Sequence, residues 1–183
     1  MKNGVDRVVI LKKTSYKFQN NEKFSITDIY NSMVNDEKRN NLIVSDIKNS
    51  IKNARIPIIL SERVEHLNIL KEKLTDLNIP IIIYKSKTTK KENLERTKIL
   101  EKADQDNIPR IILWTSKLIW EGFDDERLDT LFLTMPISWK GRISQYVWRL
   151  HRDYDWKNKV IVYDYVDDMK MLEKMSEKRK KNL

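Results

Sequence analysis

The sequence predicts an α/β domain in which a parallel β-sheet is flanked by helices. Three segments begin with the same Ile-Pro pair, at Ile56, Ile79 and Ile108, and each continues as a short apolar, β-branched run. Proline is tolerated at a strand entry, and continuous apolar runs are typical of strands buried on both faces. Segments of helical periodicity separate these runs. Strand and helix therefore alternate, which is the pattern of a doubly wound parallel sheet.

The intervening segments justify the helices one by one. Residues 19–53 are polar and asparagine-rich, and we expect two helices there, around residues 35–41. Residues 61–78 form the next helix, because leucines and a valine recur at helical spacing, and Ser61 is expected to cap it. The helix after the second strand opens at Thr89, which with Glu92 predicts a capping box.

The last third of the chain contains two more apolar runs. Residues 128–136 and 159–166 are predicted to add strands to the sheet. They lie on either side of the segment QYVWRLHR, residues 145–152, which reads as an amphipathic helix. The final residues are basic and are expected to continue a solvated helix.

Composition limits the class of protein. The chain has 36 Lys and Arg against 27 Asp and Glu, a formal charge of +9, which favours a polyanionic partner such as nucleic acid. No apolar run approaches a membrane span and the first residues lack a signal-peptide core, so a soluble cytoplasmic protein is expected. There are no cysteines, and His66 and His151 are far apart in sequence, so no metal site is expected.

Polar residues follow the predicted strands where a parallel sheet binds its ligands. Ser61 and Arg63 come after the first of the Ile-Pro strands, and Thr115 ends the third. The longer connection that follows contains Gly122 and Asp124. Taken alone, Gly122 is more typical of an ordinary turn than of a ligand site.

The amphipathic segment places polar side chains on one stripe. At about 100° per residue, Gln145, Arg149 and Arg152 fall together, opposite an apolar side that includes Val147 and Leu150. On this evidence alone the arginines are also compatible with an ordinary solvated helix face.

Three segments resemble motifs IV, V and VI of superfamily 2 helicases when taken in order. They are IPIILSERVEHLNIL, ILWTSKLIWEGFDDERLDTLFLTMPISWKGR and SQYVWRLHR. The similarity is greatest to DEAD/DEAH-type enzymes related to restriction translocases and excision-repair helicases, where these motifs lie on the second RecA-like domain. The resemblance implies a RecA-like fold, with residues 1–55 as an N-terminal connector strand and helices and residues 56–183 as the helicase C-terminal domain.

The same resemblance implies roles for individual residues. Arg149 and Arg152 would face the γ-phosphate of ATP as catalytic residues, with Arg152 as the arginine finger. Gln145, Gly122 and Asp124 would also serve the ATP site. The nucleic-acid contacts implied are Ser61, Arg63 and Thr115, with DNA expected rather than RNA.

The sequence lacks the parts that would hold ATP and Mg²⁺ directly. None of its three glycines begins a GxxxxGK[ST] loop, and neither of its Asp-Glu pairs, at Asp36 and Asp125, follows an apolar strand. We therefore expect no ATPase activity from the chain alone, and a separate first RecA-like domain with a P-loop as partner. Trp120 and Trp148 replace glycines usual in the family. Two alternatives stay open, a non-catalytic nucleic-acid-binding module and a folded remnant of a helicase gene.

Overall fold

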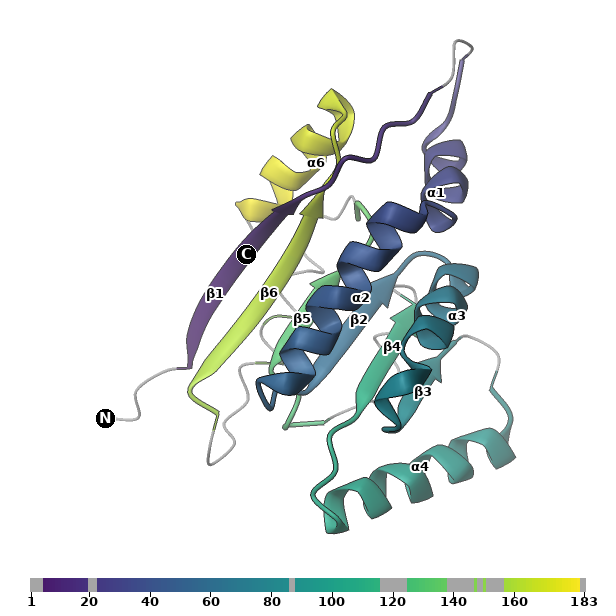
Figure 1. The fold of residues 1–183 in the computed structure, drawn as a ribbon, viewed down its shortest axis with the longest axis vertical. Helices are drawn as coiled ribbons and strands as arrows, with labels where there is room; N and C mark the ends of the chain where they lie inside the picture. Colours follow the sequence, from purple (N-terminus) through teal and green to yellow (C-terminus); the bar gives the residue numbers. More distant parts are fainter. Residues whose placement is uncertain are drawn as a thin grey trace.

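The described residues form a six-stranded sheet in which all neighbouring strands are parallel. The computed structural model describes residues 5–19, 23–85, 88–115, 125–137, 147, 150 and 157–181. The strands are β1 Asp6–Lys13, β2 Pro57–Ser61, β3 Ile81–Tyr84, β4 Ile111–Thr115, β5 Thr130–Leu133 and β6 Lys159–Val166. Their order across the sheet is β1-β6-β5-β2-β4-β3 (Figure 1). The order reverses at β2, and such a switch point is where parallel sheets usually bind ligands.

Helices cover both faces of this sheet. They are α1 Ile26–Val34, α2 Glu37–Lys52, α3 Val64–Lys73, α4 Lys90–Gln105 and α6 Lys170–Lys180, with a 3₁₀ turn at Thr75–Leu77. Helices α2 and α3 lie over one face, and α6 lies on the other (Figure 1). Helix α4 lies beyond the β3 edge and buries a single side chain, Ala103. The predicted α/β class is therefore confirmed.

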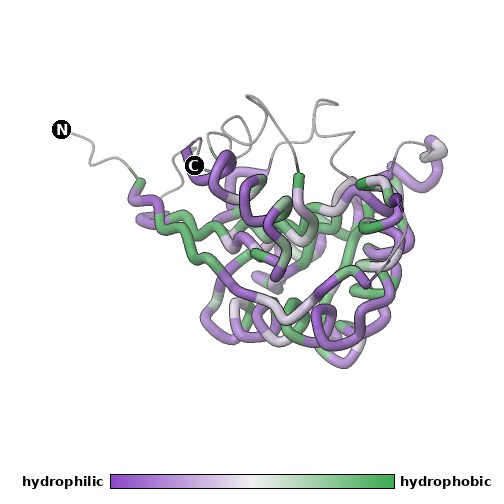
Figure 2. Tube along the Cα trace, turned by 90° about the horizontal axis from the view of Figure 1, so that it is seen from above, coloured by the Kyte–Doolittle hydropathy of each residue, from purple (hydrophilic) through white to green (hydrophobic). Residues whose placement is uncertain are grey.

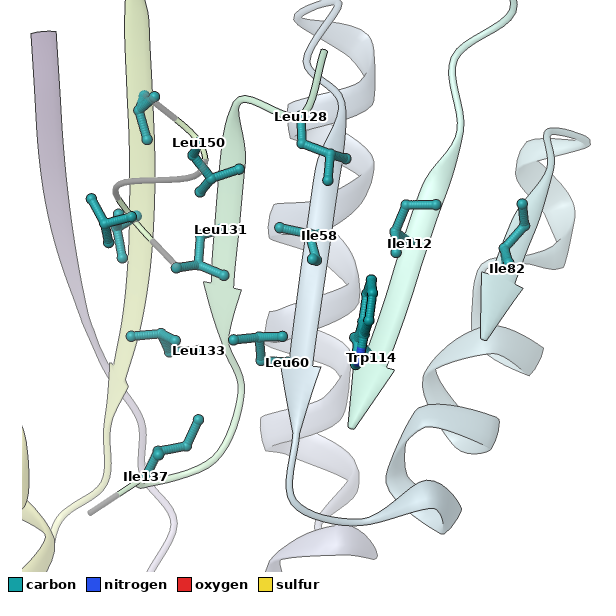
Figure 3. Close-up of a cluster of buried hydrophobic side chains, with 13 residues drawn as sticks. Ile58, Leu60, Ile82, Ile112, Trp114, Leu128, Leu131, Leu133, Ile137 and Leu150 are labelled. Atoms are coloured by element: carbon teal, nitrogen blue, oxygen red, sulfur yellow. The ribbon is translucent and has the colours of Figure 1, made fainter. Parts of the chain in front are cut away.

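Two apolar clusters fill the spaces on either side of the strands. On the α2 and α3 face, Ile43 and Ile47 of α2 pack with Ile59 and Phe132 of the sheet. On the opposite face, Ile58, Ile112 and Leu131 of the strands belong to the cluster of side chains drawn in Figure 3. In Figure 2, hydrophobic stretches of the chain accordingly gather between hydrophilic outer turns.

The apolar side of the predicted QYVWRLHR helix is confirmed where it is described. Val147 and Leu150 are both buried in the cluster of Figure 3, packed against β5 and β6. The pair therefore anchors this segment to the sheet face that α2 and α3 leave open.

Each Ile-Pro strand follows a residue with left-handed backbone geometry. Ala54, Asn78 and Asn107 have φ values of 56°, 53° and 51°. After α2 and α4 this residue sits in a Schellman-type turn, because the N–H of Arg55 donates to Ser50 O at 3.0 Å and that of Ile108 to Ala103 O at 2.8 Å. The turns send the chain back into the sheet without glycine.

The helix starts show one prediction confirmed and one wrong. Thr89 and Glu92 form the expected capping box, with both reciprocal hydrogen bonds present. Ser61 does not cap α3, because it is the last residue of β2 and the N-cap is Arg63, which has no side-chain capping bond. The two extra residues turn the chain from the strand into the helix.

The N-terminal residues share the same sheet as the rest of the chain. β1 pairs with β6 along its whole length, from Asp6 opposite Lys159 to Lys13 opposite Val166. Two helices follow it, as predicted for residues 19–53, and they are separated at Asn35 and Asp36.

A buried ion pair joins α2 to the carboxyl ends of three strands. Arg39 of α2 contacts Asp167, just past β6, through Nε at 2.7 Å and Nη2 at 3.2 Å. Its Nη1 donates to Thr134 O at the end of β5, 2.6 Å away. The hydroxyl of Thr14, just past β1, donates to Asp167 at 2.5 Å. Both charged side chains are fully buried, at 0% exposure.

A second buried pair fixes α6 to the other face. Arg179 donates to Asp164 of β6 through Nη2 at 2.8 Å, and its Nη1 reaches Ile137 O at 3.4 Å. The hydroxyl of Ser176 also donates a hydrogen bond to the carboxylate of Asp164, at 3.0 Å. Burial raises the pKa of Asp164 although Arg179 opposes that shift.

Neutralising Asp167 is expected to be far more costly than neutralising its neighbour. Asp167→Asn leaves the buried Arg39 charge uncompensated, so the free energy of unfolding should fall by about 3–5 kcal/mol. Asp168→Asn is the matched control, because the Lys17–Asp168 pair is exposed, and it should leave the free energy of unfolding almost unchanged. Urea denaturation of both variants measures the difference, and equal losses would contradict the role given to the buried pair.

Candidate functional site

Three hydroxyl side chains lie in a row at the carboxyl end of the central strands. Ser61 of β2 is directly opposite Thr115 of β4 in the sheet register. On the other side of β2, Thr134 donates to Leu60 O through both its N–H, at 3.1 Å, and its hydroxyl, at 2.6 Å. Two of the residues predicted to contact nucleic acid, Ser61 and Thr115, are therefore neighbours at the switch point of the sheet.

Ser61 is the outer member of a buried hydrogen-bond relay. Asn40 Nδ2 donates to Val34 O at 2.8 Å, so Asn40 Oδ1 is the acceptor that faces His66 Nε2 at 2.9 Å. Nε2 then carries the ring proton, and His66 Nδ1 accepts from the hydroxyl of Ser61 at 3.0 Å. The Ser61 oxygen in turn accepts from the N–H of Arg63 at 3.2 Å. Asn40, His66 and Ser61 thus each donate one hydrogen bond within this relay.

This serine, histidine and asparagine set holds a turn in place and is not arranged for nucleophilic catalysis. Ser61 and His66 are both 0% exposed, so no substrate reaches the hydroxyl. Burial, and then the nearby Arg39 charge, lower the pKa of His66 to about 3, so the ring is neutral at physiological pH. The relay therefore fixes the end of β2 and the start of α3.

Arg63, the third predicted contact, is held on α1 at the surface. Its guanidinium lies over the ring of Tyr30, 5.5 Å from the centroid, and its Nε donates to Asn31 Oδ1 at 3.3 Å. Tyr30 is anchored below through its hydroxyl to Pro136 O, and burial raises its pKa to about 12. Arg63 is half-buried. The structure thus brings Ser61, Thr115 and Arg63 to one end of the sheet.

The residues predicted for the ATP site lie outside the described part of the chain. These are Gly122, Asp124, Gln145, Arg149 and Arg152. Two described contacts adjoin them. Lys157 donates to Leu150 O at 2.9 Å, and the carboxylate of Asp125 is bound by Arg110 at 2.9 Å from Nε. Leu150 and Asp125 are thereby bonded to residues that shortly precede β6 and β4.

The sequence reasoning overlooked the residues on α2 that support this site. Arg39 and Asn40 belong to a polar segment in which no chemistry was predicted, yet both are buried. The signal was present, because Arg39, Ile43 and Ile47 share one helical stripe at four-residue spacing. A charged residue that continues an apolar stripe indicates a buried ion pair.

The described residues contain neither a cluster of metal ligands nor a membrane-spanning helix. Among these residues, no three His, Asp or Glu side chains are grouped so that they could hold a metal ion. Within the same ranges, no helix is long and apolar enough to cross a membrane.

Comparison with solved structures shows where this fold occurs. T4 UvsW matches with a TM-score of 0.71 and 14% identity over 97% of this chain and 38% of its own. The C-terminal part of the Fun30 ATPase domain has a TM-score of 0.63 and 15% identity over 79% of this chain and 46% of its own. Domain 2 of the DEAD-box helicase Mss116p, bound to an RNA duplex, has a TM-score of 0.55 and 16% identity over 98% and 61%.

These likenesses confirm the predicted RecA-like fold. The chain is similar to the C-terminal RecA-like domains of helicases and related ATPases, and it spans less than two thirds of each matched structure. No family model and no curated protein matches the sequence.

The relay makes stability depend on pH in a defined window. In the unfolded chain His66 titrates near its usual pKa of about 6.5, whereas in the fold its pKa is about 3. Above pH 6.5 the neutral His66 makes its full contribution to the stability of the fold. As pH falls below this value, only the unfolded state binds the proton, so the free energy of unfolding falls by up to about 1.4 kcal/mol per pH unit.

We therefore expect the free energy of unfolding to fall by about 2 kcal/mol between pH 6.5 and pH 5. His66→Gln should lack this fall. His151→Gln is the matched control and should keep it. Urea denaturation across this range checks the result. A pH slope in His66→Gln as steep as in the unaltered chain would show that His66 is not the group responsible.

Proposed function

We propose that this chain is the second RecA-like domain of an ATP-dependent nucleic-acid helicase or translocase. The observation that carries the proposal is the position of Ser61, Thr115 and Arg63, which gather at the carboxyl end of the central strands in a fold of this class. Thr115 is distant in sequence from Ser61 and Arg63, and the pairing of β2 with β4 brings it beside Ser61.

The three proposed nucleic-acid residues have two roles: Ser61 supports the turn, and Thr115 and Arg63 make the contact. The hydroxyl of Ser61 is bonded within the protein, so it orients the turn that presents Arg63. Thr115 retains 8% exposure, and the Arg63 guanidinium lies over the ring of Tyr30. Such a group suits phosphate oxygens, which are the usual targets of arginine on nucleic acid. DNA remains the expected substrate.

The proposed ATP site is shared with a first RecA-like domain that supplies the P-loop and the Mg²⁺-binding acid. Bound ATP would provide the phosphoryl transfer that drives movement. On this chain Gln145, Gly122 and Asp124 would contact the nucleotide, and Arg149 and Arg152 would stabilise charge on the γ-phosphate. Burial of Val147 and Leu150 supports this assignment, because it matches the predicted inward side of the segment that carries both arginines.

The alternative is a non-catalytic nucleic-acid-binding module or a folded helicase remnant. Trp120 and Trp148 favour it, since each stands where the helicase family usually has glycine beside the nucleotide. Bulky side chains at such positions would crowd a ligand unless both indoles face outward.

Turnover of ATP distinguishes these functions. The purified chain should not hydrolyse ATP with or without DNA, and should gain DNA-stimulated turnover with a P-loop protein captured from lysate of its own source. Arg152→Ala should then reduce kcat by at least about 10³-fold, and Arg152→Lys should also impair it. Arg7→Ala, an exposed arginine on β1, is the matched control and should have no effect.

The remaining outcomes decide between the readings. Turnover by the chain alone would contradict the absence of phosphate-binding machinery. Salt-sensitive DNA binding that survives loss of Arg149 and Arg152, without turnover in any mixture, would establish the binding module. Circular dichroism melting should show that every variant folds.

A further inference from the structure

The two borders of the sheet differ in what lies beside them. Helix α4 lies beyond the β3 edge, whereas β1 forms the opposite border, and no described strand pairs with its outer edge (Figure 1). β1 and its partner β6 are each eight residues long, while the other described strands have four or five. A long free edge offers a row of unpaired backbone groups to another strand.

The hydrogen bonds of β1 show which of its backbone groups face outward. The N–H of Asp6 donates to Asn158 O at 3.1 Å, and the N–H of Thr14, just past the strand, donates to Val166 O at 2.9 Å. Successive residues of a strand point their N–H and C=O groups to opposite sides, so the even-numbered residues of β1 face β6. The odd-numbered residues turn these groups to the outer edge, and they are Arg7, Val9, Leu11 and Lys13.

The outer edge of β1 lacks the features that usually block strand pairing. It contains no proline, and its register with β6 runs without a break from Asp6 to Lys13, so no bulge bends the edge away. The middle of the strand is an uninterrupted apolar run, residues 8–11, in which Leu11 is 43% exposed. Lysines follow this run only at its carboxyl end. An apolar edge of this kind pairs readily with another strand.

The apolar run of β1 matches an antiparallel copy of itself. A two-fold axis perpendicular to the sheet at Val9 places Val8 of each copy opposite Ile10 of the other. Each odd-numbered residue then meets an odd-numbered residue of the second copy, so their outward N–H and C=O groups can bond in both directions. Side-chain pattern and backbone bonding therefore agree in this register.

Charge supports the same register. With the axis at Val9, the Asp6 carboxylate of each copy lies opposite the Lys12 ammonium of the other. Lys12 also contacts Asp46 of α2 at 3.0 Å, but an ammonium has three donors and can bind a second carboxylate. Moving the axis one residue toward the carboxyl end would instead oppose Arg7 with Lys13, and like charges directly opposite each other are destabilising.

We propose that two copies of this chain pair through β1 in antiparallel orientation, which joins their sheets into one continuous sheet. The proposal is independent of the proposed function, because β6 and β5 separate β1 from β2, the strand at the candidate site. In this pairing the carboxyl ends of the two sheets point in opposite directions. Both candidate sites therefore stay open.

Sedimentation equilibrium of the purified chain tests the association. One pair of strands is a small contact, so the mean mass should rise from one chain toward two between about 1 and 300 µM. About 0.3 M salt should be present to screen the +9 charge of each chain. Val9→Pro removes an outward N–H, so it should keep the fold by circular dichroism and weaken the dimer at least about tenfold. The mass of a single chain at every concentration would overturn the proposal.

Disulfide trapping tests the register, because the chain has no cysteine and a single introduced one can bridge only two copies. The two Val9 residues would be about 5.5 Å apart at Cα, which a disulfide can span, so Val9→Cys should give a covalent dimer on oxidation. Leu11→Cys is the matched control. Leu11 is more exposed than Val9, but its two copies would be about 14 Å apart, so this variant should stay monomeric. Equal trapping of both variants would show a different contact and overturn the proposal, even if Val9→Pro fails to fold.

Discussion

The buried pair of Arg39 and Asp167 is the constraint on which the carboxyl end of the sheet depends. A guanidinium at 0% exposure is tolerated only when acceptors bind its N–H groups, and here the acceptors are Asp167 and the carbonyl of Thr134. Asp167 follows β6, Thr134 follows β5, and Thr14, which donates to Asp167, follows β1, so the network joins three strand ends. The edge where a ligand would bind is therefore fixed relative to α2 by directional bonds, whereas Ile43 and Ile47 hold the rest of α2 to the sheet by apolar packing.

The relay behind Ser61 begins at the very next residue of α2. Asn40 follows Arg39, so a single turn of helix anchors both the ion pair and the chain of hydrogen bonds through His66. The two networks also interact, because the Arg39 charge contributes to keeping the imidazole neutral. Any shift of this turn would misalign the ends of β2, β5 and β6 together. In the proposed function, these bonds connect the nucleic-acid contacts at the end of β2 to helix α2.

The strands of the sheet could be predicted from the sequence, whereas the buried polar contacts could not. Runs such as Ile81–Tyr84 are strands because β-branched residues suit a buried sheet, and the capping box at Thr89 is encoded by residues three apart. Local signals of that kind can be read directly. The Ser61 cap was predicted wrongly because the helical spacing of the apolar residues does not show that Glu62 and Arg63 form a turn before α3. Arg39 found its partner 128 positions away, and no local pattern specifies such a contact.

The placement of β1 has a consequence for the order of folding. Each of its pairs with β6 joins residues 153 apart in sequence, since Asp6 meets Lys159 and Lys13 meets Val166. The entropy of closing so long a loop is recovered only after the intervening strands have assembled. The central strands, linked through nearby helices, can form first. β1 then docks last, and it should be the first strand to exchange its amide hydrogens when the native sheet opens locally.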